Sequence, residues 1–242
     1  MQQPAYPCLS VVMPAYNEEN TLERCVDRVL ASPWTQQLLI INDGSGDRTD
    51  EIALKLQQLH PQITYISQPH NMGKGAALRT GFEHATSEYV VVQDADLEYN
   101  PEEFGLLLEP LLSGNADVVF GSRFLAGRPH RVLYFWHSVG NKFLTLMSNM
   151  FTNLNLTDME TCYKACRLEV VRSVEICENR FGFEPEFTAK VAAGGWRIYE
   201  VGVSYDGRTY EDGKKIGVKD GFRAIYCILK YSKVARRKEL RQ

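Results

Sequence analysis

The chain has 242 residues, of which 44% are hydrophobic and 24% are charged, and its formal net charge is -3. This composition is ordinary for a globular protein with a sizeable core, and it lacks the basic field typical of nucleic-acid binding, so we do not expect nucleic acid as a partner. Six cysteines without CxxC spacing predict reduced thiols in a cytoplasmic protein. We also expect no secretory signal and no membrane span, because no apolar run approaches the roughly 20 residues that a bilayer requires.

Apolar and β-branched runs alternate with helical patterns through the first half of the chain. Each predicted strand is followed by a predicted helix, the pairs being residues 9–17 with 20–32, 37–45 with 47–59, 63–68 with 73–85 and 88–96 with 101–113, before a fifth strand at 116–123. Repeated units of this kind predict an open, mostly parallel twisted sheet with helices on both faces. Continuous Val and Ile runs are typical of strands that helices cover on both faces. We therefore predict an α/β fold.

Polar residues cluster where three of these strands end, in PAYNEE, NDGSGD and QDADLE. In an open α/β sheet the ligand binds beyond the carboxyl ends of the strands, so we expect the site there. The stretch GSGDRT lacks the third glycine of a dinucleotide fingerprint, and Asp43 and Asp47 would repel a pyrophosphate, which argues against a nicotinamide enzyme. Asp43 is a candidate to accept hydrogen bonds from a ribose or a base edge, and a plain turn is the alternative explanation for the glycines beside it.

Three carboxylates, Asp94, Asp96 and Glu98, stand at alternate positions after the apolar run YVVV. In extended backbone alternate residues share a face, so the three side chains are predicted to point the same way. A divalent cation commonly reconciles such close carboxylates, and Mg²⁺ or Mn²⁺ would take one or two of their oxygens while leaving positions for substrate phosphates and water. An acidic turn ahead of the helix at Pro101, with Glu98 solvated, is the alternative interpretation.

After Arg123 the pattern changes to a long helix over residues 134–151, a further helix and a late strand within 197–208. The long helix carries a Phe- and Met-rich face, which we expect to pack on the core, contact with lipid being the alternative. Residues 233–242 form a basic tail. We expect it to be the solvated end of a last helix, and contact with anionic lipid headgroups is the alternative.

In combination, these motifs resemble family 2 glycosyltransferases with the GT-A fold, and within them the dolichyl-phosphate mannose or glucose synthase-like group. The resemblance is carried by VVMPAYNEENTL, IINDGSGDRT, NMGKGAALRTGF, VVVQDADLEYNP and VVFGSRF, and more weakly by TDMETCYKACR, FGFEPEFTAKVA and YDGRTYEDGKK. It implies a single GT-A domain over residues 1–242. Within it, about 8–124 would be a Rossmann-like nucleotide-sugar-binding half, about 125–232 an acceptor-side half and 233–242 the basic tail.

The resemblance also implies which residues form the donor site. The nucleotide sugar would be bound by residues near the first four strand ends: Pro14, Tyr16, Asn17, Glu18, Asp43, Asn71, Lys74, Asp94 and Ala95. Gly73 and Gly75 would allow close backbone approach. Asp96 and Glu98 would hold Mg²⁺ or Mn²⁺ on the diphosphate, and Glu98 stands where the group often has Gln, which adds a negative charge to the site.

Four basic residues are candidates for handling phosphate. Arg123 follows the fifth strand, and Arg208, Lys214 and Lys215 belong to the late loop DGRTYEDGKKIG. They would neutralise the leaving diphosphate or clamp an anionic acceptor, and solvated surface cations are the alternative. Because the loop has glycines on both sides and many charges, it could close over bound substrate.

The implied reaction is transfer of a sugar from GDP-mannose or a UDP-sugar to polyprenyl or dolichyl phosphate, with inversion, at the cytoplasmic membrane face. A phosphate acceptor is already anionic and needs no general base, whereas the hydroxyl of a glycan or small molecule needs one. A nucleotide-binding subunit without turnover is a third interpretation, against which the intact DADLE, Arg123 and Arg208 argue.

Two glutamates are candidates on the acceptor side. Where the group has a Thr-Ser-Gly-Phe-Arg-like passage, this chain reads ETCYK, which brings in Glu160. Glu160 could be a base for a hydroxyl acceptor, a hydrogen-bond partner of the sugar or an ion-pair partner of Lys164. Glu184 is the second candidate, and it ranks ahead of Glu186 because a helix start at Pro185 would account for Glu186.

Overall fold

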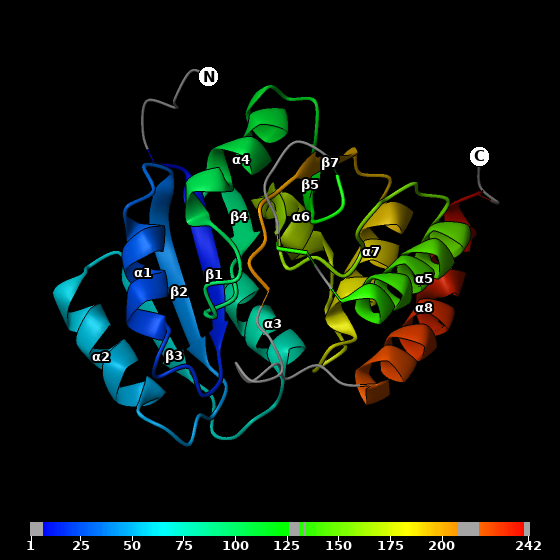
Figure 1. Ribbon diagram of the computed structural model, residues 1–242. Helices are drawn as coiled ribbons and strands as arrows, with labels where there is room; N and C mark the ends of the chain where they lie inside the picture. Colours follow the sequence, from blue (N-terminus) through cyan, green and yellow to red (C-terminus); the bar gives the residue numbers. More distant parts are fainter. Residues whose placement is uncertain (1–6, 126–130, 133, 208–217, 240–242) are drawn as a thin grey trace.

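A seven-stranded sheet runs through the centre of the molecule in the order β3-β2-β1-β4-β6-β5-β7 (Figure 1). The structure is a computed structural model that describes residues 7–125, 131–132, 134–207 and 218–239. The strands are β1 (Leu9–Ala15), β2 (Thr35–Asn42), β3 (Ile63–Ser67), β4 (Tyr89–Val92), β5 (Val118–Ser122), β6 (Lys164–Arg167) and β7 (Ile198–Gly202). Strand β6 is antiparallel to β4 and β5, and the other paired strands are parallel. The prediction of a mostly parallel α/β sheet is confirmed.

Helices cover both faces of this sheet (Figure 1). They are α1 (Leu22–Leu30), α2 (Thr49–Leu59), α3 (Lys74–His84), α4 (Phe104–Leu112), α5 (Phe135–Thr152), α6 (Leu168–Ser173), α7 (Phe183–Gly194) and α8 (Val218–Glu239), with a short 3-10 turn at Pro101–Glu103 before α4. Helix α1 shows why such segments fold: its buried residues, Leu22, Cys25, Val26 and Val29, recur at helical spacing and form one apolar face.

The middle strands are buried on both faces. Every residue of β4 and of β5 is buried, and in β1 only Pro14 is partly exposed. Their Val and Leu side chains belong to one continuous core. The continuous apolar runs in the sequence therefore indicate strands that helices cover on both sides, as predicted.

The second half of the chain contributes to the same sheet as the first half. Strand β6 inserts between β4 and β5, and β7 extends the sheet beyond β5. Helices α5, α7 and α8 pack together beside the β5 and β7 end of the sheet (Figure 1). In the described part of the chain, no helix combines the length and the apolar character that crossing a membrane requires.

Candidate active site

Five segments of the chain meet at one edge of the sheet. Strands β1, β2, β4 and β5 all end at this edge, because they run in the same direction. Strand β6 runs the opposite way, so the segment before it, residues 160–163, reaches the same edge. The predicted donor motifs and the ETCYK passage are therefore brought together, as expected for the crevice beyond the strand ends.

The loops after β1 and β2 are joined by hydrogen bonds between side chain and backbone. The backbone N–H of Asn17 donates to Ser45 Oγ (3.0 Å), and the N–H of Gly46 donates to Asn17 Oδ1 (2.9 Å). The N–H of Glu18 donates to Thr49 Oγ1 (2.9 Å). Asn17 has a φ of 53°, a left-handed conformation that Asn tolerates better than most residues. These contacts fix the two loops, and Tyr16 remains exposed at their rim.

Asp43 is buried, and its carboxylate accepts three hydrogen bonds from the segment that leads into α3. Asp43 Oδ2 accepts from Asn71 Nδ2 (3.0 Å) and from the N–H of Gly73 (2.8 Å), and Oδ1 accepts from the N–H of Met72 (2.7 Å). Burial raises the pKa of Asp43, although the Met72 and Gly73 N–H groups oppose that shift. The nearness of Asp43 and Asn71 is as expected. The role of Asp43 toward a ribose or a base stays a prediction.

Gly73 and Gly75 allow a close backbone approach, and the backbone that approaches them is the chain's own. A Cβ added at Gly75 would lie 2.1 Å from the carbonyl oxygen of Glu178. Gly73 has a φ of 102°, and a Cβ there would lie 2.4 Å from the carbonyl oxygen of Asn179. The N–H of Ala76 donates to that same oxygen (3.1 Å). The start of α3 is thus closed against residues 178–180.

Lys74 connects the end of β4 to the start of α7. Its Nζ lies 3.0 Å from Asp94 Oδ2 and 3.2 Å from Glu184 Oε1. Burial alone would lower the pKa of Lys74, but nearby negative charges outweigh it, with Asp94 contributing most and Glu184 also contributing, and they raise the pKa well above its usual value. The lysine therefore stays protonated between two carboxylates, one from the predicted donor side and one from the predicted acceptor side.

The DADLE segment differs from the prediction of extended backbone. Strand β4 ends at Val92 and turns follow, with Leu97 in the left-handed region at a φ of 65°. The turn is closed by the N–H of Glu98, which donates to Asp96 Oδ1 (3.2 Å). Alternation of strand faces is thus not what presents the carboxylates. Even so, Asp94, Asp96 and Glu98 are all partly exposed, whereas Ala95 between them is buried.

The carboxylate oxygens of Asp96 and Glu98 are suitable ligands for Mg²⁺ or Mn²⁺. Hard divalent cations bind carboxylates, and magnesium sites often use one or two of them together with substrate phosphates. No group of three His, Cys, Asp or Glu side chains suited to a metal ion occurs among the described residues. A cation held only by protein side chains is therefore not supported, whereas one shared with a diphosphate suits this pair.

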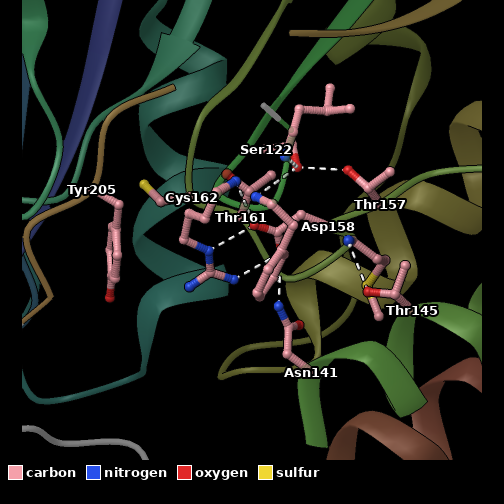
Figure 2. Close-up of polar contacts among 12 residues, drawn as sticks. Ser122, Asn141, Thr145, Thr157, Asp158, Thr161, Cys162 and Tyr205 are labelled. Carbon is pink, nitrogen blue, oxygen red and sulfur yellow. Dashed lines mark hydrogen bonds and ion pairs between the residues drawn. The ribbon is translucent and has the colours of Figure 1, made fainter. Parts of the chain in front are cut away.

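Arg123 forms a buried ion pair with Asp158 (Figure 2). The sequence motifs did not predict Asp158 as a site residue. Arg123 Nε donates to Asp158 Oδ2 (2.6 Å), and Nη2 donates to Oδ1 (2.7 Å). Asp158 Oδ2 also accepts from the Arg123 N–H (3.1 Å), and Oδ1 accepts from Asn141 Nδ2 (3.0 Å). The alternative that Arg123 is a solvated surface cation is therefore wrong, because both members of the pair are buried.

Tyr205 lies between Arg123 and the carboxylate of Glu98. The Arg123 guanidinium is 5.1 Å from the Tyr205 ring centroid, and the Tyr205 hydroxyl donates to Glu98 Oε2 (2.7 Å). Burial, followed by the charge of Glu98, raises the pKa of Tyr205, so its hydroxyl stays a donor at neutral pH. The sequence motifs did not predict Tyr205 as a site residue, although its position just after the carboxyl end of a predicted strand, now β7, could have indicated it.

Glu160 and Glu184 each keep a buried carboxylate oxygen without a hydrogen-bond partner, Oε1 in Glu160 and Oε2 in Glu184. Burial, followed by the nearby charge of Glu184, raises the pKa of Glu160 to about 8. An unpaired buried oxygen is costly, so such atoms are candidates for contact with a ligand. The unpaired oxygens of both predicted acceptor-side glutamates could thus each accept a hydrogen bond from a substrate hydroxyl.

The neighbouring charged residues have structural partners. Lys164 Nζ donates to the backbone carbonyls of Thr161 and Met159 (3.1 Å to Met159), which does not support the interpretation of Glu160 as its ion-pair partner. Glu186 accepts from the N–H groups of Cys177 (2.8 Å) and Glu178 (2.7 Å) at the start of α7, which supports its lower ranking. Arg208 and Lys214 lie outside the described residues, as does most of their loop.

The comparison with family profiles identifies the chain. The profile of glycosyl transferase family 2 matches residues 10–174, which contain the donor motifs, Arg123 and Asp158. The chain belongs to this family. It is 30% identical over 219 residues to a dolichyl-phosphate beta-glucosyltransferase of Trichomonas vaginalis, an alignment that covers 84% of this chain and 67% of the relative.

A second relative agrees with this placement, and a solved structure shares the fold. The chain is 27% identical over 229 residues to a dolichol-phosphate mannosyltransferase of Pyrococcus furiosus, covering 92% of this chain and 64% of the relative. The chain spans about two thirds or less of the length of the curated relatives it matches. Glucosyl-3-phosphoglycerate synthase from Mycobacterium tuberculosis, in complex with Mn²⁺ and UDP, has a TM-score of 0.72 at 19% identity, covering 96% of this chain and 86% of that one. This likeness confirms the GT-A-type fold.

Proposed function

We propose that this glycosyltransferase moves a sugar from a nucleotide-diphospho sugar to a polyprenyl phosphate at the cytoplasmic face of a membrane, with Mg²⁺ or Mn²⁺ bound by Asp96 and Glu98. The observation that carries the proposal is that protonated Lys74 pairs with Asp94, in the same segment as Asp96 and Glu98. At the same sheet edge, Tyr205 links Glu98 to Arg123. The names of the relatives support a dolichyl phosphate acceptor, and the solved neighbour with Mn²⁺ and UDP supports a metal and a nucleotide donor.

The chain's own residues would prepare a displacement at the anomeric carbon. The metal, when bound, would carry charge that develops on the leaving diphosphate. Lys74 would add a fixed positive charge beside Asp94, and Asp158 would hold Arg123 in one orientation for an anionic acceptor. Because a phosphate oxygen is already anionic, no residue has to remove a proton from it. A single displacement would invert the anomeric configuration.

A hydroxyl acceptor is the second candidate, favoured by the unpaired carboxylate oxygen of Glu160. A carboxylate whose pKa is about 8 is a stronger base than an ordinary glutamate, as general base catalysis of attack by a hydroxyl requires. The two candidates differ in Glu160→Gln. Transfer to polyprenyl phosphate should persist in this variant if the acceptor is a phosphate, whereas near-complete loss of transfer to a hydroxyl acceptor would favour the second candidate.

The metal assignment is tested by calorimetry with UDP- and GDP-sugars, with and without Mn²⁺. We expect Mn²⁺ to tighten binding of the preferred donor in the wild type and to have little effect in Asp96→Asn. Asp27→Asn, which removes an exposed carboxylate from α1, is the matched control and should behave as the wild type. Unchanged metal dependence in Asp96→Asn would refute the assignment.

The acceptor and the catalytic activity are tested with a donor screen against polyprenyl phosphate and soluble glycans. Product formation from polyprenyl phosphate supports the proposal, and product from a soluble acceptor alone supports the second candidate. Tight donor binding with neither transfer nor slow sugar release would instead favour the nucleotide-binding subunit.

A further inference from the structure

The segment that follows β7, residues 203–207, is bound to the loop that follows β4. The N–H of Asp206 donates to the backbone carbonyl of Glu98 (2.9 Å). Two residues earlier, the N–H and the hydroxyl of Ser204 both donate to Oε2 of the buried Glu103 (2.9 Å each). The late segment is therefore fixed relative to the backbone of Glu98 on both sides of the residue that lies between these contacts.

That residue is Tyr205, whose ring is only 8% exposed and packs against two neighbours. Its centroid lies 5.2 Å from the centroid of the Tyr99 ring, at an interplanar angle of 59°. The Arg123 guanidinium, which Asp158 holds in one orientation, lies 5.1 Å from the same centroid. Aromatic and cation–π contacts of this kind restrict a ring to one position. The Tyr205 hydroxyl is therefore a donor with a fixed location.

The acceptor of this hydroxyl is the side chain of Glu98, which is partly exposed. Tyr205 donates to Glu98 Oε2 (2.7 Å), while Asp206 holds the Glu98 carbonyl. Within the turn, the N–H of Glu98 donates to Asp96 Oδ1 (3.2 Å). A partly exposed glutamate ordinarily keeps much of its rotamer freedom, which costs free energy when a ligand orders it. Here the direction of the Glu98 carboxylate is set by contacts from the distant segment 203–207.

We propose that Tyr205 is a positioning residue for the metal ligand Glu98 and that it favours Mg²⁺ or Mn²⁺ over Ca²⁺. The inference rests on the metal assignment in the proposed function. Hydrogen-bond partners of metal ligands orient those ligands, and removing such a partner commonly weakens metal binding. A hydroxyl that binds Glu98 Oε2 also opposes the use of both carboxylate oxygens by one cation. Ca²⁺ often takes both oxygens of a carboxylate, whereas Mg²⁺ requires a regular octahedral set of ligands.

A structural explanation of the same contact makes a different prediction. Buried tyrosine hydroxyls usually find a hydrogen-bond partner, and Glu98 could serve only as that partner. Loss of the hydroxyl would then lower the stability of the protein without changing its preference among cations. The cation preference is therefore the measurement that separates the two explanations.

The test is Tyr205→Phe, which removes the hydroxyl and keeps the ring that packs against Tyr99 and Arg123. Calorimetry measures the affinity for the preferred donor among UDP- and GDP-sugars without a cation, with Mn²⁺ and with Ca²⁺. The metal effect is the ratio of the affinity with the cation to the affinity without it. We expect the Mn²⁺ effect to fall at least about tenfold and the Ca²⁺ effect to change less than about twofold. An unchanged ratio of the two effects would overturn the proposal, whatever the change in thermal stability.

Tyr65→Phe is the matched control. The Tyr65 hydroxyl also donates to a carboxylate, that of Asp50 on α2, which is not among the predicted metal ligands. This variant should keep the Mn²⁺ and Ca²⁺ effects of the wild type. Equal falls of the Mn²⁺ effect in the two variants would mean that loss of any such hydroxyl disturbs the site, and the proposal would be wrong.

A double-mutant cycle tests whether Tyr205 acts through Glu98. In the background of Glu98→Ala the carboxylate that Tyr205 positions is gone, so adding Tyr205→Phe should change the Mn²⁺ effect by less than about twofold. A further fall as large as that in the wild-type background would show that the hydroxyl acts by another route, which contradicts the proposal.

Asp96→Asn separates failure of this inference from failure of the proposed function. If Asp96→Asn abolishes the Mn²⁺ effect and Tyr205→Phe leaves it intact, the metal assignment stands and the positioning role of Tyr205 is wrong. If the wild type shows no Mn²⁺ effect, both are wrong. Loss of the effect in both variants, with donor affinity in the absence of a cation retained in Tyr205→Phe, supports both.

Discussion

The two sides of the site are built by different kinds of contact. On the predicted donor side, the loops after β1 and β2 are joined by single hydrogen bonds between side chain and backbone, and Asp94, Asp96 and Glu98 remain partly exposed, although Asp43 is buried. On the predicted acceptor side, oppositely charged groups are buried together, as in the pair of Arg123 with Asp158. Exposed polar loops cost little to rearrange, whereas a buried charge is tolerated only with its partner in place. Substitutions should therefore have unequal effects on the two sides.

The largest expected effect follows from breaking the buried pair on the acceptor side. Asp158→Asn leaves Arg123 buried without its counter-charge, and we expect a loss of about 3–5 kcal/mol in the free energy of unfolding. Glu23→Gln is the matched control, because Glu23 pairs with Lys55 and both side chains are largely exposed, so solvent screens that pair. Urea unfolding of both variants checks the prediction. Similar losses in the two would contradict the contrast between the sides.

A smaller but still clear effect is expected where the donor side meets the acceptor side. In Gly75→Ala the new Cβ would meet the Glu178 carbonyl, so we expect destabilisation of about 2 kcal/mol despite the better helix propensity of alanine. Gly140→Ala is the matched control in α5, where nothing lies within 4 Å of the added Cβ, and it should stabilise by about 0.5–1 kcal/mol. Thermal unfolding should show opposite signs, and a gain in both variants would mean that α3 is not closed against residues 178–180.

The smallest expected effect, a change of at most about 1.4 kcal/mol per pH unit, is a pH dependence that belongs to the predicted acceptor side. Between the ordinary pKa of 4.5 and the raised pKa of about 8, folded Glu160 keeps a proton that the unfolded chain has released. The contribution of Glu160 to the free energy of unfolding therefore falls as the pH rises from 4.5 to 8. Glu160→Gln should flatten this slope in urea unfolding at several pH values. Glu109→Gln, on the exposed side of α4, should leave the slope as in the wild type; equal slopes in all three proteins would refute the prediction.

The first half of the chain was predictable because its signals are local. Each strand up to β5 is an apolar run, each following helix has its own periodicity, and parallel strands bring their ends to one edge without further information. Strand β6 was not predicted, since four residues, KACR, carry no periodicity that separates them from a loop. The extended backbone expected for DADLE was wrong, because Leu97 adopts a left-handed conformation that is uncommon outside glycine.

The acceptor side was less predictable because its contacts join distant residues. Asp158 is 35 residues from Arg123, and Tyr205 is 107 residues from Glu98. The spacing of these residues in the sequence does not predict their contacts. The expectation that the Phe- and Met-rich face of α5 packs on the core is wrong for most of that face: the buried residues of α5 are polar, whereas Phe135, Phe143 and Met150 are exposed. A periodic apolar stripe in a sequence gives the face of a helix but not whether that face points inward.

The contacts at the start of α3 limit which groups can neutralise the diphosphate in the proposed reaction. A helix start with free N–H groups is a ready-made receptor for phosphate. Here the protein itself already occupies these N–H groups: the Asp43 carboxylate accepts hydrogen bonds from the N–H groups of Met72 and Gly73, and the Asn179 carbonyl accepts one from the N–H of Ala76. An internal carboxylate thus stands where a phosphate would otherwise bind. In the proposed reaction, side-chain cations and the metal at Asp96 must therefore neutralise the diphosphate, and those are the parts of the site that substitution can remove one at a time.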